Sequence, residues 1–141
     1  MSATTPFLYP VLALIIWTFL IWTLMYWRRI PAMNAITKNT QEFIDNPKLG
    51  EQLPPRVRWA GENFNHLHEQ PVIFYALMFY LALTDQMTDF NLYLAWGYVF
   101  LRVIHSLVQV TSNKVLIRFG VFALSSVVLI VMTVGAFLAA I

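Results

Sequence analysis

Long stretches without a charged side chain constrain this chain more than any other feature of its sequence. Residues 6–27 form one such stretch, which is long enough to cross the ~30 Å hydrocarbon core of a bilayer as a helix. The 141 residues are 59% hydrophobic and only 11% charged, and a soluble domain of this size has no core large enough to bury so much apolar surface. The sequence therefore predicts an integral membrane protein.

Four membrane-spanning helices are predicted, over residues 6–27, 62–84, 90–112 and 116–141. A polar loop over residues 28–57 joins the first two, and the other two connections are short. Spans joined in this way run antiparallel to one another. We therefore expect one all-α domain over residues 1–141, an integral membrane four-helix bundle with up-down-up-down connections.

The distribution of Lys and Arg predicts the orientation of the bundle. Lys114 lies between the third and fourth spans, whereas the turn between the second and third spans and both termini have no Lys or Arg. The segment between the first two spans carries Arg28, Arg29, Lys38, Lys48, Arg56 and Arg58. Cytoplasmic loops carry the excess of basic residues, so we expect the 28–57 loop in the cytoplasm and both termini outside. These cations are topology signals, and no nucleic-acid partner is expected.

The second span begins in a polar segment and continues into an apolar one. No Gly or Pro cluster separates the two parts, so a single helix is predicted, kinked at Pro71. Arg58, Glu62, Asn65 and Glu69 fall close to one face of that helix. Residues 71–84 alone are too short to cross the bilayer, which draws Glu69 and Asn65 toward membrane depth.

A second polar stripe lies on the third span. It consists of Arg102, His105, Gln109 and Ser112 at helical spacing, with Arg102 ~15 Å from the cytoplasmic end. Arg118 follows one turn inside the fourth span. Both stripes lie in the cytoplasmic halves of their spans, so Glu69, Arg102 and Arg118 can share one pocket.

Two interpretations of this pocket remain open. In one, Glu69 and Arg102 form a structural ion pair that holds the helices together. In the other, which we favour, the convergent polar groups bind a ligand, because ionisable residues inside a membrane usually serve function. Arg side chains bind carboxylates in a fork, so the ligand is expected to be anionic or zwitterionic.

Other kinds of site are excluded or disfavoured. The chain has no cysteine, which rules out disulfides, a thiolate zinc site and a cysteine nucleophile. His66 and His68 are two residues apart and project to nearly opposite sides of a helix, so no metal site is expected.

Two segments resemble the MAPEG family, the membrane-associated proteins in eicosanoid and glutathione metabolism. The first is the run NHLHEQPVIFY from Asn65 to Tyr75, which is similar to the family's Asn/Arg-containing run with its Glu and nearby Pro. The second is Arg102-Val-Ile-His105, with Arg118 thirteen residues after the histidine. That spacing resembles the third-to-fourth span region of the prostaglandin E synthase branch.

The resemblance implies a homotrimer that binds glutathione between adjacent subunits. It matches Glu69, Arg102, His105 and Arg118 to family site residues, with Arg118 stabilising the glutathione thiolate. The glutathione-binding residues implied are Arg58, Asn65, His66, Glu69, Arg102, His105 and Gln109, and Arg118 is the catalytic residue implied. Where the enzymes have Arg, Arg, Asn, Tyr and Ser, this chain has Glu62, Asn65, His66, Gln109 and Phe119.

The function expected from this resemblance is that of a glutathione-dependent transferase or peroxidase. It would act on lipophilic electrophiles or lipid hydroperoxides, with membrane lipids and a small lipophilic substrate as partners. The chain is most similar to bacterial members, which implies the bacterial inner membrane. The alternative is a non-catalytic lipid-binding or scaffold protein of the same fold.

Overall fold

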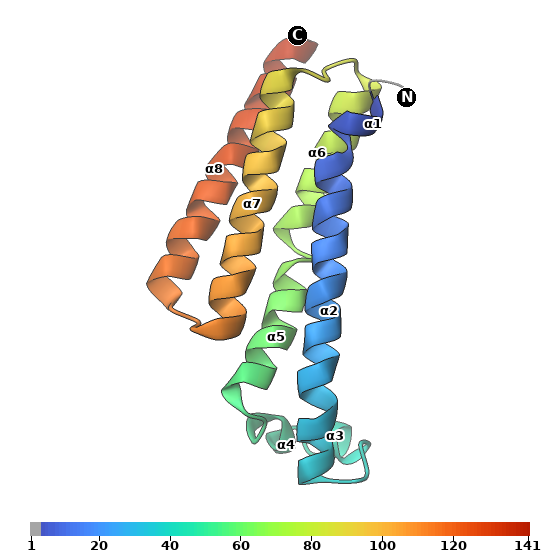
Figure 1. Cartoon of the computed structure of the whole chain (residues 1–141), viewed down its shortest axis with the longest axis vertical. Coiled ribbons are helices and arrows are strands. Elements are labelled where there is room, and N and C mark those ends of the chain that lie inside the picture. Colours follow the sequence, from blue (N-terminus) through green and yellow to red (C-terminus); the bar gives the residue numbers. More distant parts are fainter. Residues whose placement is uncertain (1–3) are drawn as a thin grey trace.

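The structure, a computed structural model, describes residues 4–141, and every regular element among them is a helix. Four long or paired helical segments run antiparallel along the molecule (Figure 1). The helices are α1 Thr4–Phe7, α2 Tyr9–Ile36, α3 Glu42–Asp45, α4 Lys48–Glu51, α5 Pro55–His66, α6 Gln70–Leu83, α7 Asp89–Thr111 and α8 Val115–Ala140. The predicted all-α, up-down-up-down membrane bundle is thus confirmed.

Three of these helices are long and apolar enough to cross a membrane: α2, α7 and α8. They qualify by length and hydropathy, although α7 carries Arg102 near its middle and α8 carries Arg118 in its first turn. The remaining crossing segment consists of α5 and α6, which follow one another along the side of α2 (Figure 1). At 1.5 Å per residue, the 14 residues of α6 cover only ~21 Å, so part of α5 has to enter the membrane as well.

The prediction of one kinked helix for this second segment was wrong, because the helix ends at His66 and restarts at Gln70. Pro71 lies in the first turn of α6, where a residue without a backbone N–H costs little. In a continuous helix the same ring would clash with the carbonyl of Leu67 and remove its hydrogen bond. The chain therefore breaks at residues 67–69 and does not kink.

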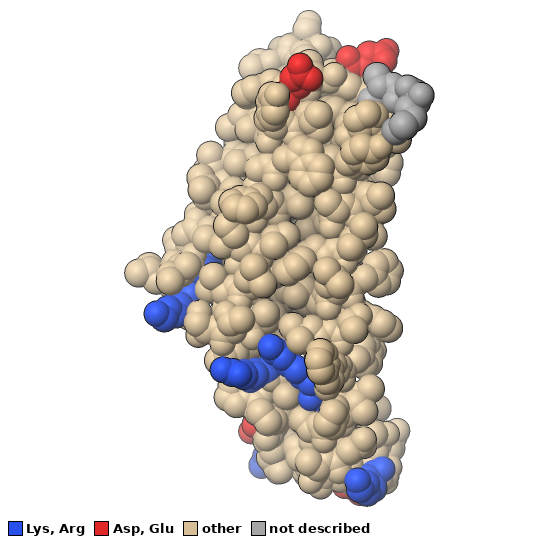
Figure 2. Space-filling view, viewed as in Figure 1, with Lys and Arg blue, Asp and Glu red and all other residues tan. Residues whose placement is uncertain are grey.

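The loop predicted over residues 28–57 is also shorter than expected, because α2 continues to Ile36 through Pro31. The short helices α3 and α4 complete the end of the molecule to which α2 descends (Figure 1). Lys and Arg side chains on the face shown in Figure 2 gather over this half, while the opposite end shows acidic groups. This is the charge asymmetry that the sequence predicts.

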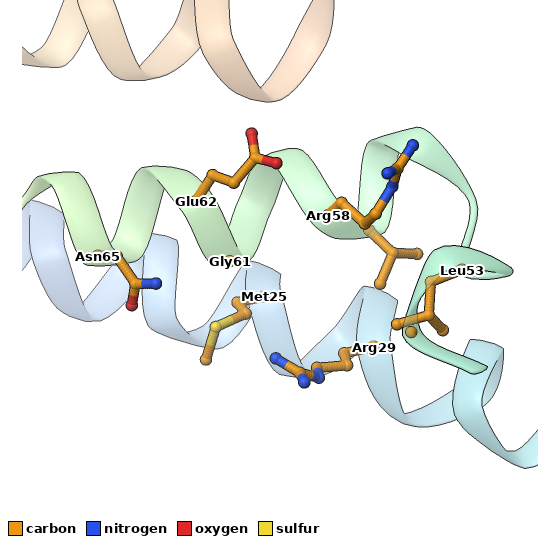
Figure 3. A pocket seen from close by; sticks show the side chains of 9 residues that line it. Met25, Arg29, Leu53, Arg58, Gly61, Glu62 and Asn65 are labelled. Atoms are coloured by element: carbon orange, nitrogen blue, oxygen red, sulfur yellow. The ribbon is translucent and has the colours of Figure 1, made fainter. Parts of the chain in front are cut away.

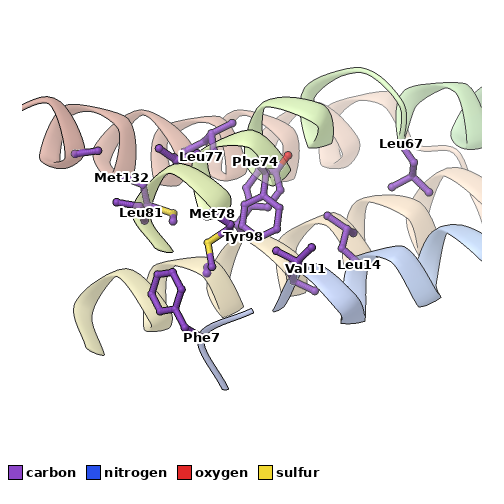
Figure 4. Close-up of a cluster of buried hydrophobic side chains, with 14 of the residues drawn as sticks. Phe7, Val11, Leu14, Leu67, Phe74, Leu77, Met78, Leu81, Tyr98 and Met132 are labelled. Carbon is purple, nitrogen blue, oxygen red and sulfur yellow. The ribbon is translucent and has the colours of Figure 1, made fainter. Parts of the chain in front are cut away.

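Most of the apolar core lies in the half of the bundle nearer the chain termini, and a smaller part reaches toward the basic end through Ile21, Leu67 and Val110. Figure 4 shows the side chains of this core. Phe74 of α6 and Tyr98 of α7 are fully buried, and their rings stack with centroids 4.6 Å apart. Around them pack buried side chains from every long segment, namely Phe7, Val11, Leu14, Leu77, Met78, Leu81 and Met132. The buried polar side chains are concentrated nearer the basic end, at the level of the break between α5 and α6.

Candidate functional site

Arg102 is the centre of the polar region. It lies on α7 with no exposed surface, and its Nη2 donates to the backbone carbonyl of His66 at 3.2 Å. His66 is the last residue of α5, where carbonyls have no partner within the helix and the helix dipole favours a cation. Arg102 therefore caps the broken end of α5.

The same nitrogen fixes the imidazole of His66. Arg102 Nη2 lies 2.7 Å from His66 Nδ1. A guanidinium has only donors, so Nδ1 accepts and the proton of the neutral ring sits on Nε2. His66 also stacks on His105, with centroids 4.7 Å apart, and both rings lie near Phe122.

Three donor or acceptor groups at this centre have no hydrogen-bond partner in the described residues 4–141. They are Arg102 Nε, Arg102 Nη1 and His105 Nδ1, all buried. The guanidinium also lies over the Phe122 ring, 5.7 Å from its centroid. Unpaired buried polar groups are costly, and they are concentrated where a protein awaits a ligand or a partner.

A pocket of about 190 Å³ opens beside this centre, and we call it the His66 pocket. Its lining comprises His66, His105, Val115, Arg118, Phe119 and Phe122. Arg118 is held in place by Asn113, whose Oδ1 accepts from Arg118 Nη1 at 2.6 Å. Two cations, one at the wall and one buried beneath, make this pocket suited to an anion such as a thiolate.

A second pocket, of about 290 Å³, lies on the other side of α5, and we call it the Arg58 pocket. Arg58, Glu62 and Asn65 line it from α5, and Met25 and Arg29 line it from α2. The charged ends of Arg58 and Glu62 point away from Arg29 (Figure 3). Gly50, Leu53, Val57 and Gly61 complete the lining. Two guanidinium groups and one carboxylate at a pocket wall suit a zwitterion that carries carboxylates and an amine.

The predicted site residues are therefore divided between separate places within one chain. His66, His105 and Arg118 meet in one pocket, with Arg102 beside it, and Arg58 and Asn65 lie in the other. Gln109 lines neither of these two pockets. Its Oε1 accepts from Asn63 Nδ2 at 2.9 Å, and both residues are buried.

The structural ion pair between Glu69 and Arg102 does not form within residues 4–141, where Arg102 contacts His66 in its place. Glu69 follows the end of α5 and is exposed. The helix break separates it from the face on which a continuous helix would have put it beside the third span.

Sequence reasoning missed three contributors: Asn63, Arg29 and Phe122. Asn63 stands among the polar residues of the second segment, and Arg29 lies beside Arg28, where a basic residue indicates only the orientation of a span. Phe122 lies one turn after Arg118, a spacing that places both on one face of α8. That spacing could have predicted that Phe122 lines the same pocket as Arg118.

Comparison with known proteins gives one match. The family model described as MAPEG family matches residues 7–138. The chain belongs to the MAPEG family. No curated protein and no solved structure matches it significantly.

The matched region, residues 7–138, includes the lining of both pockets and nearly the full length of all four crossing segments. A MAPEG protein is a membrane protein of the glutathione and eicosanoid family, which agrees with three helices long enough to cross a bilayer. The two segments that prompted the resemblance, residues 65–75 and 102–118, contain the helix break and the walls of the His66 pocket.

Proposed function

We propose that this MAPEG protein binds glutathione and transfers its thiolate to a lipophilic electrophile, or uses it to reduce a lipid hydroperoxide. The observation that carries the proposal is the buried guanidinium of Arg102, whose Nε and Nη1 have no hydrogen-bond partner within residues 4–141, beside a pocket walled by Arg118. Positive charge in a site that excludes water favours the ionised thiol, the form that attacks.

Glutathione is a better fit than a simple anion because the two pockets offer different chemistry. The Arg58 pocket, with Arg29, Arg58 and Glu62, suits the carboxylates and the amine of the peptide. The His66 pocket suits its sulfur. Residues Arg58, Asn65, His66, Glu69, Arg102, His105 and Gln109 remain the proposed binding set, with Asn63 and Gln109 acting through the packing of α5 on α7.

The division between pockets supports a homotrimer in which each ligand lies between two subunits. Asn65 and His66 are adjacent in sequence, so their side chains differ by ~100° around α5 and face different pockets. Each volume is at or below the ~300 Å³ of the smallest drug-sized ligand sites. We propose that the Arg58 pocket of one subunit adjoins the His66 pocket of the next.

The proposed setting is the bacterial inner membrane, with both termini outside and residues 28–57 in the cytoplasm. The basic residues near the ends of α2 and α5 support this orientation. Glutathione would then enter from the cytoplasm, on the side where both pockets lie.

Titration with glutathione tests the proposal directly. The purified protein should give a saturable ultraviolet absorbance of the thiolate, and Arg118→Ala should lose it together with a 10²- to 10³-fold fall in turnover. Lys114→Ala is the matched control, since Lys114 lies in the same turn but outside both pockets. Unchanged turnover in Arg118→Ala would remove Arg118 from the mechanism.

Mixed trimers test the sharing between subunits. Arg58→Ala and Arg118→Ala should each be inactive alone, and their co-expression should restore part of the activity, because some sites then combine two intact pockets. No recovery in trimers shown to be mixed would place the whole site in one subunit. If the folded protein binds no glutathione at millimolar concentration, the alternative is a non-catalytic lipid-binding or scaffold protein.

A further inference from the structure

The turn between α7 and α8 supplies an anchor for Arg118. Asn113 Oδ1 accepts a hydrogen bond from Arg118 Nη1 at 2.6 Å, and both residues are partly buried. Arg118 lines the His66 pocket, whereas Asn113 does not. Within residues 4–141 no carboxylate pairs with Arg118, so the amide of Asn113 is the side chain that fixes its guanidinium.

The backbone of this turn holds Asn113 in place. The N–H groups of Ser112 and Asn113 both donate to the carbonyl of Val108, at 3.1 and 2.7 Å. Asn113 has a φ of 48°, in the left-handed region that glycine and asparagine occupy more readily than other residues. Glycine would therefore also fit the turn at this position, and the turn itself does not require an amide.

An amide oxygen is a neutral acceptor, and this property decides what the anchor does. It binds an N–H group of the guanidinium and leaves the positive charge uncompensated. A carboxylate in the same place would also hold Arg118, but it would form an ion pair and cancel much of that charge. With no acceptor there, the long side chain of Arg118 would regain its rotamer freedom and leave the pocket wall for part of the time.

We propose that Asn113 is a positioning residue, which holds the Arg118 guanidinium at the wall of the His66 pocket and leaves its charge to the thiolate of glutathione. This inference rests on the proposed function, in which Arg118 stabilises the thiolate. Asn113 acts through Arg118, since it does not line the pocket itself. Its backbone fits the turn, and its side chain is polar without being charged.

A pH titration of bound glutathione tests this role, with the ultraviolet absorbance of the thiolate as the signal. Asn113→Asp keeps an acceptor but neutralises Arg118, so the titration midpoint should rise by about one pH unit. Asn113→Gly keeps the turn but frees Arg118, so the midpoint should rise less. In Asn113→Gly, kcat should also fall about tenfold with little change in the KM for glutathione. Lys114→Ala, in the same turn and outside both pockets, is the control and should leave the midpoint unchanged.

A second measurement follows the anchor without glutathione. Phenylglyoxal modifies accessible arginines, and mass spectrometry gives the rate at each one. Asn113→Gly should be modified at Arg118 several-fold faster than the wild type, while the rate at Arg58 stays the same. An unchanged rate at Arg118 would contradict the anchor.

The thiolate titration separates this inference from the proposed function. If Arg118→Ala raises the midpoint and neither Asn113 variant does, the positioning role is overturned and the proposed function stands. A larger rise in Asn113→Gly than in Asn113→Asp would also overturn it, because the neutrality of the acceptor would then be irrelevant. A wild type that gives no thiolate signal refutes the proposed function, and the positioning role with it.

Discussion

The half of the bundle nearer the chain termini and the half around the α5–α6 break bury their interiors in different ways. In the first, Phe74, Tyr98 and Met78 interlock without a single exposed side chain among them. In the second, Arg102, His105, Asn63 and Ser106 are just as buried, yet each has at least one polar atom without a hydrogen-bond partner among the described residues 4–141. The buried residues of the first half serve packing, and the buried polar groups of the second half can still bind a ligand.

The largest effect is expected in the packed half. Phe74→Ala removes a ring that is stacked on Tyr98 and leaves a cavity, which should lower the free energy of unfolding by about 3–5 kcal/mol. Unfolding in mixed micelles with dodecyl sulfate measures this change. Phe79→Ala, on the same helix but half exposed, is the control and should cost far less. Equal losses of unfolding free energy in the two variants would show that Phe74 is not part of a packed core.

A smaller effect is expected in the polar half. Asn63→Ala should cost about 1–3 kcal/mol, because Gln109 then has a buried amide without its partner. Gln109→Leu alone should cost a similar amount, whereas the double variant should lose much less than the sum of the two. A double-mutant cycle on the free energy of unfolding measures this coupling, and purely additive losses would contradict the contact.

The smallest effect is expected at the edge of the Arg58 pocket. A Cβ added at Gly61 would meet nothing closer than 3.9 Å, the distance to Arg29 Nη1 and to Met25 Sδ. Gly61→Ala should therefore fold as well as the wild type, and gain up to about 1 kcal/mol from helix propensity. The pocket becomes slightly narrower, so glutathione should bind a few-fold more weakly. A clear loss of stability would show that the pocket is closed in the assembled protein.

The two halves were also predictable to different extents. Uncharged runs of membrane length predict α2 and most of α8 directly, α7 follows from a hydrophobic run that Arg102 interrupts, and Lys and Arg mark the basic end. Helical spacing places Arg102 and His105 on one face of α7, and Arg118 is predicted beside them because it lies one turn inside α8, at the same end of the bundle. The position of Glu69 did not follow, because it required knowing that Pro71 starts a helix and does not kink one. The break at residues 67–69 decides which polar residues of the second segment face α2 and which face α7. The spacing of residues in the sequence does not predict such a break.

Arg28 has a consequence for how the protein is made. Its Nη1 donates to the carbonyls of Arg56 and Val110, at 3.1 and 2.9 Å, which lie 28 and 82 residues further along the chain. During synthesis the first of these partners exists early, but the second appears only when the third crossing segment is nearly complete. The basic end of the bundle therefore closes late. In a nascent chain that has only its first two crossing segments, Arg28 lacks the bond to Val110, and the basic end of the bundle is not yet packed.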